Sequence, residues 1–598
     1  MPRRTFRSRH ALSVGATALL VAAGCGDDAT RPVPAQEHDA GAPIVDLVVD
    51  ANRNGALDPG APDEDAGEDA FGPAAGAAFL ANVDDDDDDG VPDAEDAVVN
   101  GAADIADLAP LAVRAWPAAP DGAAGTLAVE NAGHVRLFRV AGPAADPASY
   151  VEVVDPGAVE LAADELREGV RFAIEGREFA ASIAEGAWDG TVRVSLTVHR
   201  ADGAAVGADA VLLRVAPLLL QYNTAPADEV YYSDGGRFNA GFAGGVQAMA
   251  DAAGVPLVGL DLPGGFRDFD PWTQDFFDVG YTSIPGPGGA PVGLHVAVRS
   301  AQPDRTAGRI VETHFAGPDW GTVFVHQDDW SGEDHGYSMN SFGNWDVVPP
   351  YGAYPLGRNV WGSGERAGER PDAAFVDFVR AQRVQPEIVL DTSWLLVGHV
   401  DEVFSWVQAD GPRGWRLLVA DPTLAREMLR QLSELGHGDA TLFSGKSWID
   451  WDFGNEYPAD VTVDEILGDA DLMAASQQAQ LRTDEMLAEL REETGLADDE
   501  ITPMPFVYED VFGGLVAHQP GTVNLLHVNG HVVVPDPFGP VVEGVDVFRK
   551  DVEDRLGALG LRVFFADDWD VYHRNLGEVH CGTNVTRRMD LRWWESGR

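Results

Sequence analysis

The spacing of apolar residues changes once along this chain, near residue 220, and this change restricts the possible folds more than any other feature. Between Ile44 and about Leu220, apolar and polar residues alternate in short runs punctuated by Gly, Pro and Asp, as at 135–140 and 191–198. A period of two is typical of strands with one buried face. Segment 44–220 is therefore predicted to form a β-sandwich.

Beyond Gln221, strand-like runs alternate with helical ones. Residues 415–420 predict a strand, and Asp421 and Pro422 then supply an N-cap and a first helical turn. Gly436 is expected to end this helix. Its buried face is predicted from an apolar stripe at Leu424, Met428, Leu432 and Leu435.

The same alternation continues to the end of the chain. It predicts helices over 373–382, 473–494 and 547–559, and a two-residue hairpin at Asn529-Gly530. Segment 221–598 is thus expected to be a mixed α/β domain. Single hydrophobic cores stop growing near roughly 250–300 residues, so a chain of 598 residues is expected to form two folded domains.

The N-terminus has the pattern of an export signal. Several arginines precede an apolar stretch at 11–23, which is too short to span a bilayer comfortably. The stretch ends at Cys25 in a lipobox-like sequence, so residues 1–25 are interpreted as a signal peptide with lipidation at Cys25. Residues 26–43 would be a flexible tether. We expect an exported lipoprotein of the cell envelope, facing the periplasm or the cell surface; an ordinary signal peptide or weak anchor is the alternative.

Charge limits the classes of partner. Lys and Arg number 41 against 98 Asp and Glu, a formal charge of −57. Such a surface repels phosphate backbones, so nucleic acid is not expected as a partner, whereas cationic peptides and calcium ions are. Part of the acidity is local, because residues 84–89 are six consecutive aspartates. This run is either a solvated tract or a set of cation ligands.

The chain has two cysteines, Cys25 and Cys581. If Cys25 is acylated, a disulfide between them is excluded and Cys581 is the only free thiol of an exported protein. A lone thiol in an oxidising compartment invites oxidation, so we expect Cys581 to have a function.

Reactive side chains concentrate in three segments: 272–275, 398–402 and 577–584. They supply two carboxylates, a histidine and a thiol. Residues 394–397 are strand-like, and residues two apart in an extended chain face the same side, so His399 and Asp401 can line one pocket. Taken singly, His399 and Cys581 could equally be structural and Asp275 a loop carboxylate.

Together the segments resemble the catalytic domain of the protein-arginine deiminases. The resemblance spans about Asp228 to Trp594 and rests on motifs in the family's order: Trp272-Thr-Gln-Asp275, Ser341-Phe-Gly-Asn344, Tyr354-Pro-Leu-Gly-Arg358, Val397-Gly-His-Val-Asp-Glu402, Pro537-Phe-Gly-Pro540 and Gly577-Glu-Val-His-Cys-Gly-Thr-Asn584. It implies a five-bladed, pseudo-symmetric α/β propeller over 221–598. An immunoglobulin-like, calcium-binding β-sandwich over 44–220 would precede it.

The resemblance also implies roles for individual residues. Cys581 would be the nucleophile, His399 the general acid and base, and Asp275 and Asp401 the carboxylates that grip the substrate guanidinium. This fits the chemistry, because a guanidinium keeps its charge and offers planar N–H donors that carboxylates accept in pairs. Trp272 would wall the stem of the substrate arginine, and Arg305 would contact the substrate backbone.

Calcium is the implied cofactor, held by the hard oxygen donors it prefers. In the catalytic domain the ligands would be Gln274, Asp278, Asp346 and the carbonyls of Phe342 and Trp345. A second family site lacks acidic ligands here, because Phe276 and Arg299 occupy their places, so fewer calcium ions are expected than in vertebrate relatives. The ligands in the sandwich would be Asn82, Asp84, Asp86 and Asp96, with Asp319 from the catalytic domain.

The sequence therefore predicts calcium-dependent hydrolysis of arginine in proteins or peptides to citrulline and ammonia, through a thiouronium intermediate on Cys581. One alternative is a deiminase of free arginine or another small guanidine compound. The other is a catalytically inactive calcium-binding surface protein.

Overall fold

The computed structural model describes residues 44–263, 265, 269–327, 337–449 and 454–597. The predicted signal peptide at 1–25, with Cys25, and the predicted tether at 26–43 lie outside these residues. Over the part of the chain that is described, no helix combines the length and apolar character needed to cross a membrane.

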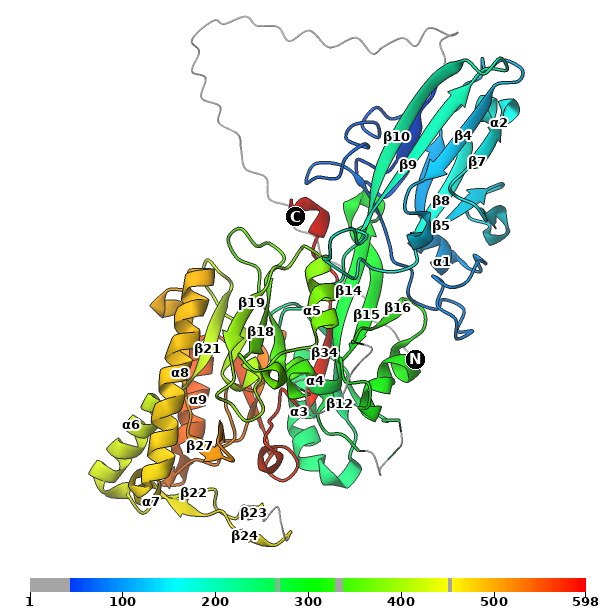
Figure 1. Cartoon of the computed structure of the whole chain (residues 1–598). Helices are drawn as coiled ribbons and strands as arrows, with labels where there is room; N and C mark the ends of the chain where they lie inside the picture. The colour runs from blue at the N-terminus through cyan, green and yellow to red at the C-terminus, as the bar shows by residue number, and fades with distance from the viewer. Residues whose placement is uncertain (1–43, 264, 266–268, 328–336, 450–453, 598) are drawn as a thin grey trace, which may run out of the picture. The chain divides into compact units, whose positions relative to one another are not determined.

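Residues 44–217, which were predicted to form the strands of a sandwich, fold into two five-stranded sheets (Figure 1). All strand pairs in them are antiparallel except β2 with β10. One sheet has the order β1 (Leu47–Val49), β3 (Ala109–Val113), β8 (Val170–Gly176), β5 (Val135–Val140), β6 (Tyr150–Glu152). The other has the order β2 (Ala77–Phe79), β10 (Ala205–Val215), β9 (Thr191–His199), β4 (Ala124–Val129), β7 (Val159–Ala162).

Strand β9 shows why this segment forms a sandwich. Every second side chain along it is buried, from Val192 to Val198, and the residues between are half-buried. The buried set packs in one core with Leu111 and Ile174 of the opposite sheet. The period-two prediction for 44–220 is therefore confirmed at the level of strands and faces.

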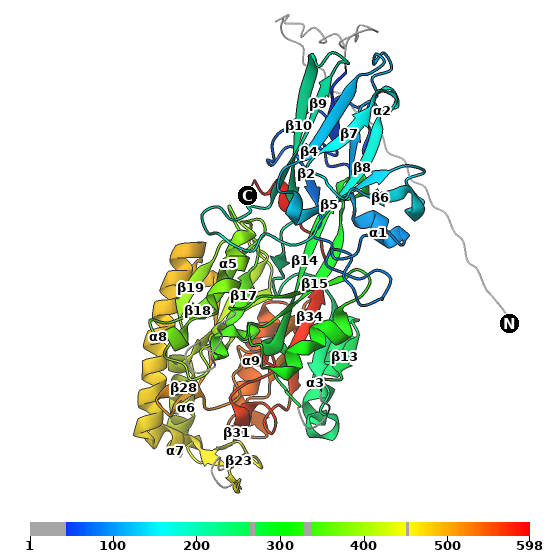
Figure 2. The same ribbon diagram turned by 45° about the vertical axis from the view of Figure 1, so that its right-hand side comes forward.

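From residue 219 onwards, the chain forms five separate sheets with one common pattern (Figure 2). In each, a central strand pairs antiparallel with one neighbour and parallel with the other. The five sheets are β34 (Thr583–Arg587), β12 (Ala227–Ser233), β13 (Leu257–Leu260); β14 (Phe277–Pro285), β15 (Pro291–Arg299), β16 (Trp320–Phe324), extended by β11 (Leu219–Leu220); β17 (Trp345–Val348), β18 (Arg358–Ser363), β19 (Ile388–Asp391); β20 (Phe404–Gln408), β21 (Trp415–Asp421), β26 (Ile501–Pro505); and β29 (Leu526–Val528), β30 (His531–Pro535), β33 (Arg562–Ala566).

Helical segments provide the crossovers that parallel neighbours require. Four of the five crossovers contain α-helices, namely α3 (Ala240–Ala253), α5 (Ala373–Ala381), α6 (Pro422–Leu432) with α7 (Val463–Gly468) and α8 (Ala470–Thr494), and α9 (Val547–Ala558). The remaining elements are α1 (Ala102–Asp107), α2 (Ala163–Glu168), α4 (Thr273–Phe276), β22 (Thr441–Leu442), β23 (Ser447–Ile449), β24 (Glu456–Pro458), β25 (Val461–Thr462), β27 (Tyr508–Val511), β28 (Gly514–Ala517), β31 (Val541–Val542) and β32 (Val545–Asp546), besides short 3₁₀ and π turns. The α/β prediction is confirmed, and every sheet among the described residues is open.

Several local predictions are confirmed. The Asp421 side chain accepts a hydrogen bond from Leu424 N at the start of α6. The expected end at Gly436 was wrong, because α6 ends at Leu432 and Gly436, with φ +89°, lies in the π turn that follows. Asn529 and Gly530 have φ of 48° and 77°, as a type I′ hairpin requires, between paired strands β29 and β30.

The predicted apolar stripe of α6 is confirmed at Leu432, which is buried, and is wrong at Leu435, which is 74% exposed. Leu424 and Met428 are half-buried, and the helix also buries Ala425 and Leu429. The helix ends at Leu432, and the π turn that follows carries Leu435 outside the helical register.

The strand predicted at 394–397 does not form. These residues make turns, with one isolated bridge between Leu395 and Leu515, and a 3₁₀ turn begins at Val400. His399 and Asp401 therefore meet through a tight turn and not through alternation along a strand.

The sandwich core continues into the α/β region. One apolar cluster contains Leu127 and Val194 of the sandwich together with Trp345 and Phe375. The Phe179 ring meets the Phe378 ring edge-on, with 6.2 Å between centroids. Residues 43–598 consequently form one compact unit.

Candidate active site

Three distant segments bring Asp275, His399, Asp401 and Cys581 together. A methyl group on Gly343 would lie 2.6 Å from His399 Nδ1 and 3.0 Å from both Asp275 Oδ1 and Asp401 Oδ2. Cys581 Sγ lies 3.7 Å from Asp401 Oδ2. Three of the side chains that the sequence singled out therefore meet beside Gly343, and the fourth, Cys581, contacts one of them.

Local hydrogen bonds hold these side chains in place. Asp275 sits on the single-turn helix α4, and the neighbouring Gln274 N donates to the Cys581 carbonyl at 3.0 Å. Gly398 has φ +91°, a conformation that favours glycine. Glu402 Oε1 accepts from Gly398 N and His399 N, at 3.0 and 2.8 Å, and so fixes the turn that presents His399 and Asp401.

The hydrogen bonds of His399 determine which nitrogen can exchange a proton. His399 Nε2 lies 2.8 Å from the Ser338 carbonyl oxygen, which can only accept, so Nε2 carries a hydrogen. Nδ1 faces Asp275 Oδ1 at 3.9 Å. Nδ1 is therefore the nitrogen available to the site.

The site carries uncompensated negative charge. Asp275 and Asp401 are buried, and within the described residues Oδ1 of each has no hydrogen-bond partner. Burial raises the pKa of Asp275, and the charges of His399 and Arg305 oppose the rise. Buried carboxylate oxygens of this kind suit a cationic ligand with several N–H donors.

The environment of Cys581 favours the thiol over the thiolate. Burial raises the pKa of Cys581 well above the usual value, and the charges of Asp401 and Asp275 raise it further. A positive ligand between the two carboxylates would offset their repulsion of the thiolate and lower this pKa.

Trp272 and Arg305 also lie at the site. Arg305 makes a two-pronged ion pair with Asp270, at 2.8 and 3.0 Å, and its Nη2 is 3.7 Å from Asp275 Oδ2. Trp272 packs so closely on Gly577 that a methyl group there would lie 2.3 Å from Trp272 Cζ3.

The sequence analysis missed two residues of the site. His580 Nδ1 lies 2.9 Å from Asp401 Oδ2, and Asn524 contacts both the sulfur and the main chain of Cys581. His580 lies within one of the quoted motifs and could have been selected as a titratable neighbour of the thiol. Asn524 follows a Gly-Thr-Val run with no reactive side chain, so no local signal identifies it.

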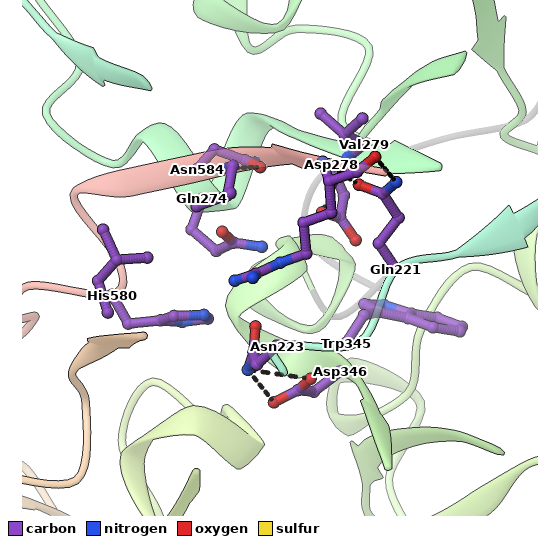
Figure 3. A pocket seen from close by; sticks show the side chains of 12 residues that line it. Gln221, Asn223, Gln274, Asp278, Val279, Trp345, Asp346, His580 and Asn584 are labelled. Carbon is purple, nitrogen blue, oxygen red and sulfur yellow. Dashed lines mark hydrogen bonds between the residues drawn. The ribbon is translucent and has the colours of Figure 1, made fainter. Parts of the chain in front are cut away.

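A cavity of about 30 Å³ lies behind the site, and the predicted ligands Gln274, Asp278, Trp345 and Asp346 line it. Figure 3 shows Gln274, Asn223 and His580 pointing into the same space. Burial raises the pKa of Asp278 to about 6 and that of Asp346 to about 7.

This oxygen-rich lining fits a hard cation such as calcium. Phe342 and Trp345 are buried in the turn before β17, where Trp345 N donates to the Phe342 carbonyl. The buried guanidinium of Arg587 lines the same cavity and donates to the carbonyls of Ala225 and His527.

A second acidic group lies in the sandwich, after β2. One carboxylate oxygen from each of Asp84, Asp86 and Asp93 lies within 4.8 Å of the others. Buried oxygens without a hydrogen-bond partner in the described chain include Oδ1 of Asn82 and Asp84 and both carboxylate oxygens of Asp86. Burial and mutual repulsion raise the pKa of Asp84 to about 8, which is the behaviour of carboxylates that lack a counter-ion.

The predicted ligands of this group are placed as follows. Asp319 N donates to Asp84 Oδ2 at 3.1 Å, so the main chain of Asp319 contacts this acidic group. Asp93, which the sequence analysis did not select, completes it, whereas Asp96 lies outside it and accepts from Val98 N. The donor set fits calcium.

A second calcium site of the family was expected to lack its acidic ligands at Phe276 and Arg299. In the structure, these two side chains make other contacts. Phe276 is fully buried among apolar residues. Arg299 pairs with Glu312 at 2.8 Å and stacks 4.2 Å above the Phe324 ring.

The family model and the relatives found by sequence agree on one family. A family model described as protein-arginine deiminase (PAD) matches residues 205–595. Protein-arginine deiminase type-3 of Homo sapiens is 31% identical over 477 residues, 78% of this chain and 68% of that protein. Protein-arginine deiminase type-4 of Mus musculus is 30% identical over 599 residues, 94% of this chain and 84% of that protein. Among solved structures, an agmatine deiminase of C. jejuni aligns with a TM-score of 0.33 and 11% identity, over 62% of this chain and 97% of that chain.

Proposed function

The chain belongs to the protein-arginine deiminase family and is an enzyme of that class, and on this basis we propose that it hydrolyses arginine in proteins or peptides to citrulline and ammonia in a calcium-dependent reaction. The observation that carries the proposal is that two buried carboxylates and a histidine Nδ1 meet beside Gly343, and that the thiol of Cys581 contacts one of these carboxylates. A guanidinium held between the two carboxylates would satisfy the oxygens that lack partners and bring its central carbon near the sulfur.

The first half of the reaction forms a covalent intermediate. Substrate binding places positive charge beside Asp275 and Asp401 and so favours the thiolate of Cys581. The sulfur attacks the guanidinium carbon, and a C–S bond forms in a tetrahedral adduct. His399, protonated on Nδ1, gives its proton to the departing nitrogen, the C–N bond breaks, and ammonia leaves a thiouronium on Cys581.

The second half consumes water. His399 Nδ1 takes a proton from a water molecule whose oxygen attacks the thiouronium carbon. The C–S bond then breaks, the electron pair returns to the sulfur, and the remaining hydroxyl proton passes to solvent. Citrulline is released with His399 protonated again. Trp272 would pack against the aliphatic part of the substrate arginine side chain. Arg305, held by Asp270, would contact the substrate backbone.

Calcium would be held in the catalytic domain by Gln274, Asp278, Asp346 and the carbonyls of Phe342 and Trp345. In the sandwich it would be held by Asn82, Asp84, Asp86 and Asp93, with Asp319 and Asp96 nearby. Bound there, it would supply the positive charge that these oxygens lack and fix the segments that carry them. The absence of acidic ligands at Phe276 and Arg299 supports fewer ions here than in vertebrate relatives.

The domain plan belongs to the same proposal. Five sheets of one pattern support a five-bladed, pseudo-symmetric α/β propeller over 221–598, and the two sheets of the preceding segment support an immunoglobulin-like domain over 44–220. Residues 1–25 would direct export, Cys25 would carry the lipid, and 26–43 would tether the enzyme to the cell envelope. The acidic surface supports cationic protein segments as substrates.

Two other functions remain to be separated by experiment. Deimination of free arginine or another small guanidine compound needs the same four side chains. An inactive calcium-binding protein would need only the acidic groups.

The test measures ammonia and citrulline released from a peptide that has a central arginine and blocked termini. The parent enzyme is assayed with calcium and with chelator, and the Cys581→Ala variant is assayed with calcium. We expect turnover with calcium and at least a 1,000-fold loss in the variant, since removal of a nucleophile typically costs this much. Turnover of free arginine alone would establish the small-guanidine activity. Calcium binding without turnover of either substrate would establish the inactive protein.

A further inference from the structure

Asn524 occupies the junction of three segments of the site. It lies between β28 and β29 and is 2% exposed. Its Oδ1 accepts from His580 N at 2.9 Å and from Cys581 N at 3.3 Å. Its Nδ2 lies 3.3 Å from the Asp401 carbonyl oxygen and 3.4 Å from Cys581 Sγ. No other residue within the described chain bonds to both the nucleophile and the main chain of a guanidinium-binding aspartate.

The orientation of the amide follows from its neighbours. Two backbone N–H groups face one end of the side chain, and only an oxygen can accept from them. The Asp401 carbonyl faces the other end and can only accept, so that end must be the NH₂ group. One hydrogen of Nδ2 is then used by the Asp401 carbonyl, and the second points to the sulfur.

This second hydrogen can stabilise negative charge on the sulfur. Cys581 Sγ also lies 3.7 Å from Asp401 Oδ2, a carboxylate that repels a negative sulfur. The Nδ2–H of Asn524 is the side-chain donor that the described structure places on Sγ. Sulfur is negative before it attacks carbon and again when the C–S bond breaks, so a fixed donor acts at both ends of the covalent intermediate.

We propose that Asn524 is a further catalytic residue of this enzyme, whose amide donates to the Cys581 sulfur while it joins the nucleophile loop to Asp401. The inference rests on the proposed function, because it assumes that Cys581 is the nucleophile. It assigns Asn524 a direct contact with a reacting atom, beyond its packing role.

The test uses two substitutions in the full-length enzyme. Asn524→Asp keeps the oxygen that faces the two N–H groups and replaces the donor to the sulfur with an acceptor. Asn524→Ala removes both the amide oxygen that accepts and the NH₂ group that donates. Loss of a hydrogen bond to a charged group typically costs a factor of about 10 to 150, so we expect kcat for the blocked arginine peptide to fall by at least about 10-fold in Asn524→Ala and further in Asn524→Asp. KM should stay within about threefold of the parent, because both changes keep the carboxylates of Asp275 and Asp401 and alter only a hydrogen bond to the Asp401 main chain.

A second readout does not depend on turnover. Alkylation of Cys581 by the uncharged reagent iodoacetamide should slow in Asn524→Asp. The matched control is Asn359→Asp, in a second buried asparagine that bonds to the Gln385 carbonyl in another sheet. The control should change the melting temperature without changing kcat or the alkylation rate.

The outcomes separate the two proposals. If Cys581→Ala leaves turnover intact, the proposed nucleophile is wrong and this inference fails with it. If Cys581→Ala is inactive while folded Asn524→Asp and Asn524→Ala keep kcat and alkylation within threefold of the parent, only the role of Asn524 is overturned. If Asn524→Asp does not fold, Asn524→Ala decides the question alone.

Discussion

At the scale of single residues, Gly343 allows three side chains of the site to pack closely against the main chain. The nearest atoms to a methyl group on it would be His399 Nδ1, Asp275 Oδ1 and Asp401 Oδ2. Any side chain at this position would overlap the histidine and the two carboxylates, so their arrangement depends on glycine.

Gly343→Ala should therefore inactivate the enzyme without unfolding it. Gly343 does not have a positive φ, so alanine fits the backbone, but its methyl group would displace the three side chains. Displacements of about 1 Å at a site can cost about 100-fold, and we expect a loss of that size in kcat/KM for the blocked peptide.

The matched control is Gly244→Ala in helix α3, where an added methyl group would meet no atom within 4 Å. It should keep full activity and gain slightly in melting temperature, because alanine favours helices over glycine by about 1 kcal/mol. A Gly343→Ala enzyme with kcat/KM within threefold of the parent would show that activity does not depend on the close packing of the three side chains against Gly343.

At the scale of elements, the acidic segment from Asn82 to helix α1 behaves as one unit. Asp93 N donates to the Asp84 carbonyl and Ala94 N to the Asn82 carbonyl, which folds the segment back on itself. Asp107, at the end of α1, is also buried, and burial together with Asp84 raises its pKa to about 9. The buried carboxylates of this element carry negative charge that a bound cation can balance.

Asp86→Asn should remove a calcium ion from this element or weaken its binding at least tenfold. Both carboxylate oxygens of Asp86 are buried without a partner in the described structure, so they are free to act as ligands. Native mass spectrometry gives the number of ions, and calorimetry gives the affinity. Asp69→Asn, on an exposed side chain outside the acidic groups, should keep the parent number of ions. An unchanged ion count and affinity in Asp86→Asn would remove Asp86 from the ligand set.

At the scale of the whole molecule, the acidic groups link stability to pH. Without a cation, burial raises the pKa of Asp84 to about 8, of Asp93 to about 7 and of Asp86 to about 6 in the folded state, against 3.8 for the ordinary side chain. The folded protein then binds more protons than the unfolded chain above about pH 4. Stability falls as pH rises through this window, and the loss continues through the pKa of Asp84 near 8.

In chelator, the melting temperature should thus be lower at pH 8.0 than at pH 5.5. Calcium should raise it at both values and shrink the difference, because a bound cation replaces the protons. Scanning fluorimetry measures all four conditions. Asp84→Asn in chelator should flatten the pH dependence relative to the parent, which separates this group from the general repulsion of a chain with charge −57. Equal melting temperatures at both pH values in chelator would contradict the linkage.

The sequence by itself determined the parts of the fold that depend on near neighbours. The alternation of β9, the cap at Asp421 and the turn at Asn529-Gly530 each depend on residues within a few positions, so local physics decides them. The four reactive side chains were also visible, because their residue types and motifs are specific even without a structure. The α6 stripe failed at Leu435, because the π turn after Leu432 takes that residue out of the helical register, which no period of 3.6 encodes.

The tertiary structure alone decided the remainder of the site. His580 and Asp401 are 179 positions apart and Asn524 and Cys581 are 57 apart, yet each pair is in hydrogen-bond contact. Asp93 replaced Asp96 among the clustered carboxylates for the same reason, since the loop that folds 93 inward is fixed by contacts with 82 and 84. Burial, charge balance and the direction of a hydrogen bond arise only when distant segments pack, and a sequence pattern records only the neighbours along the chain.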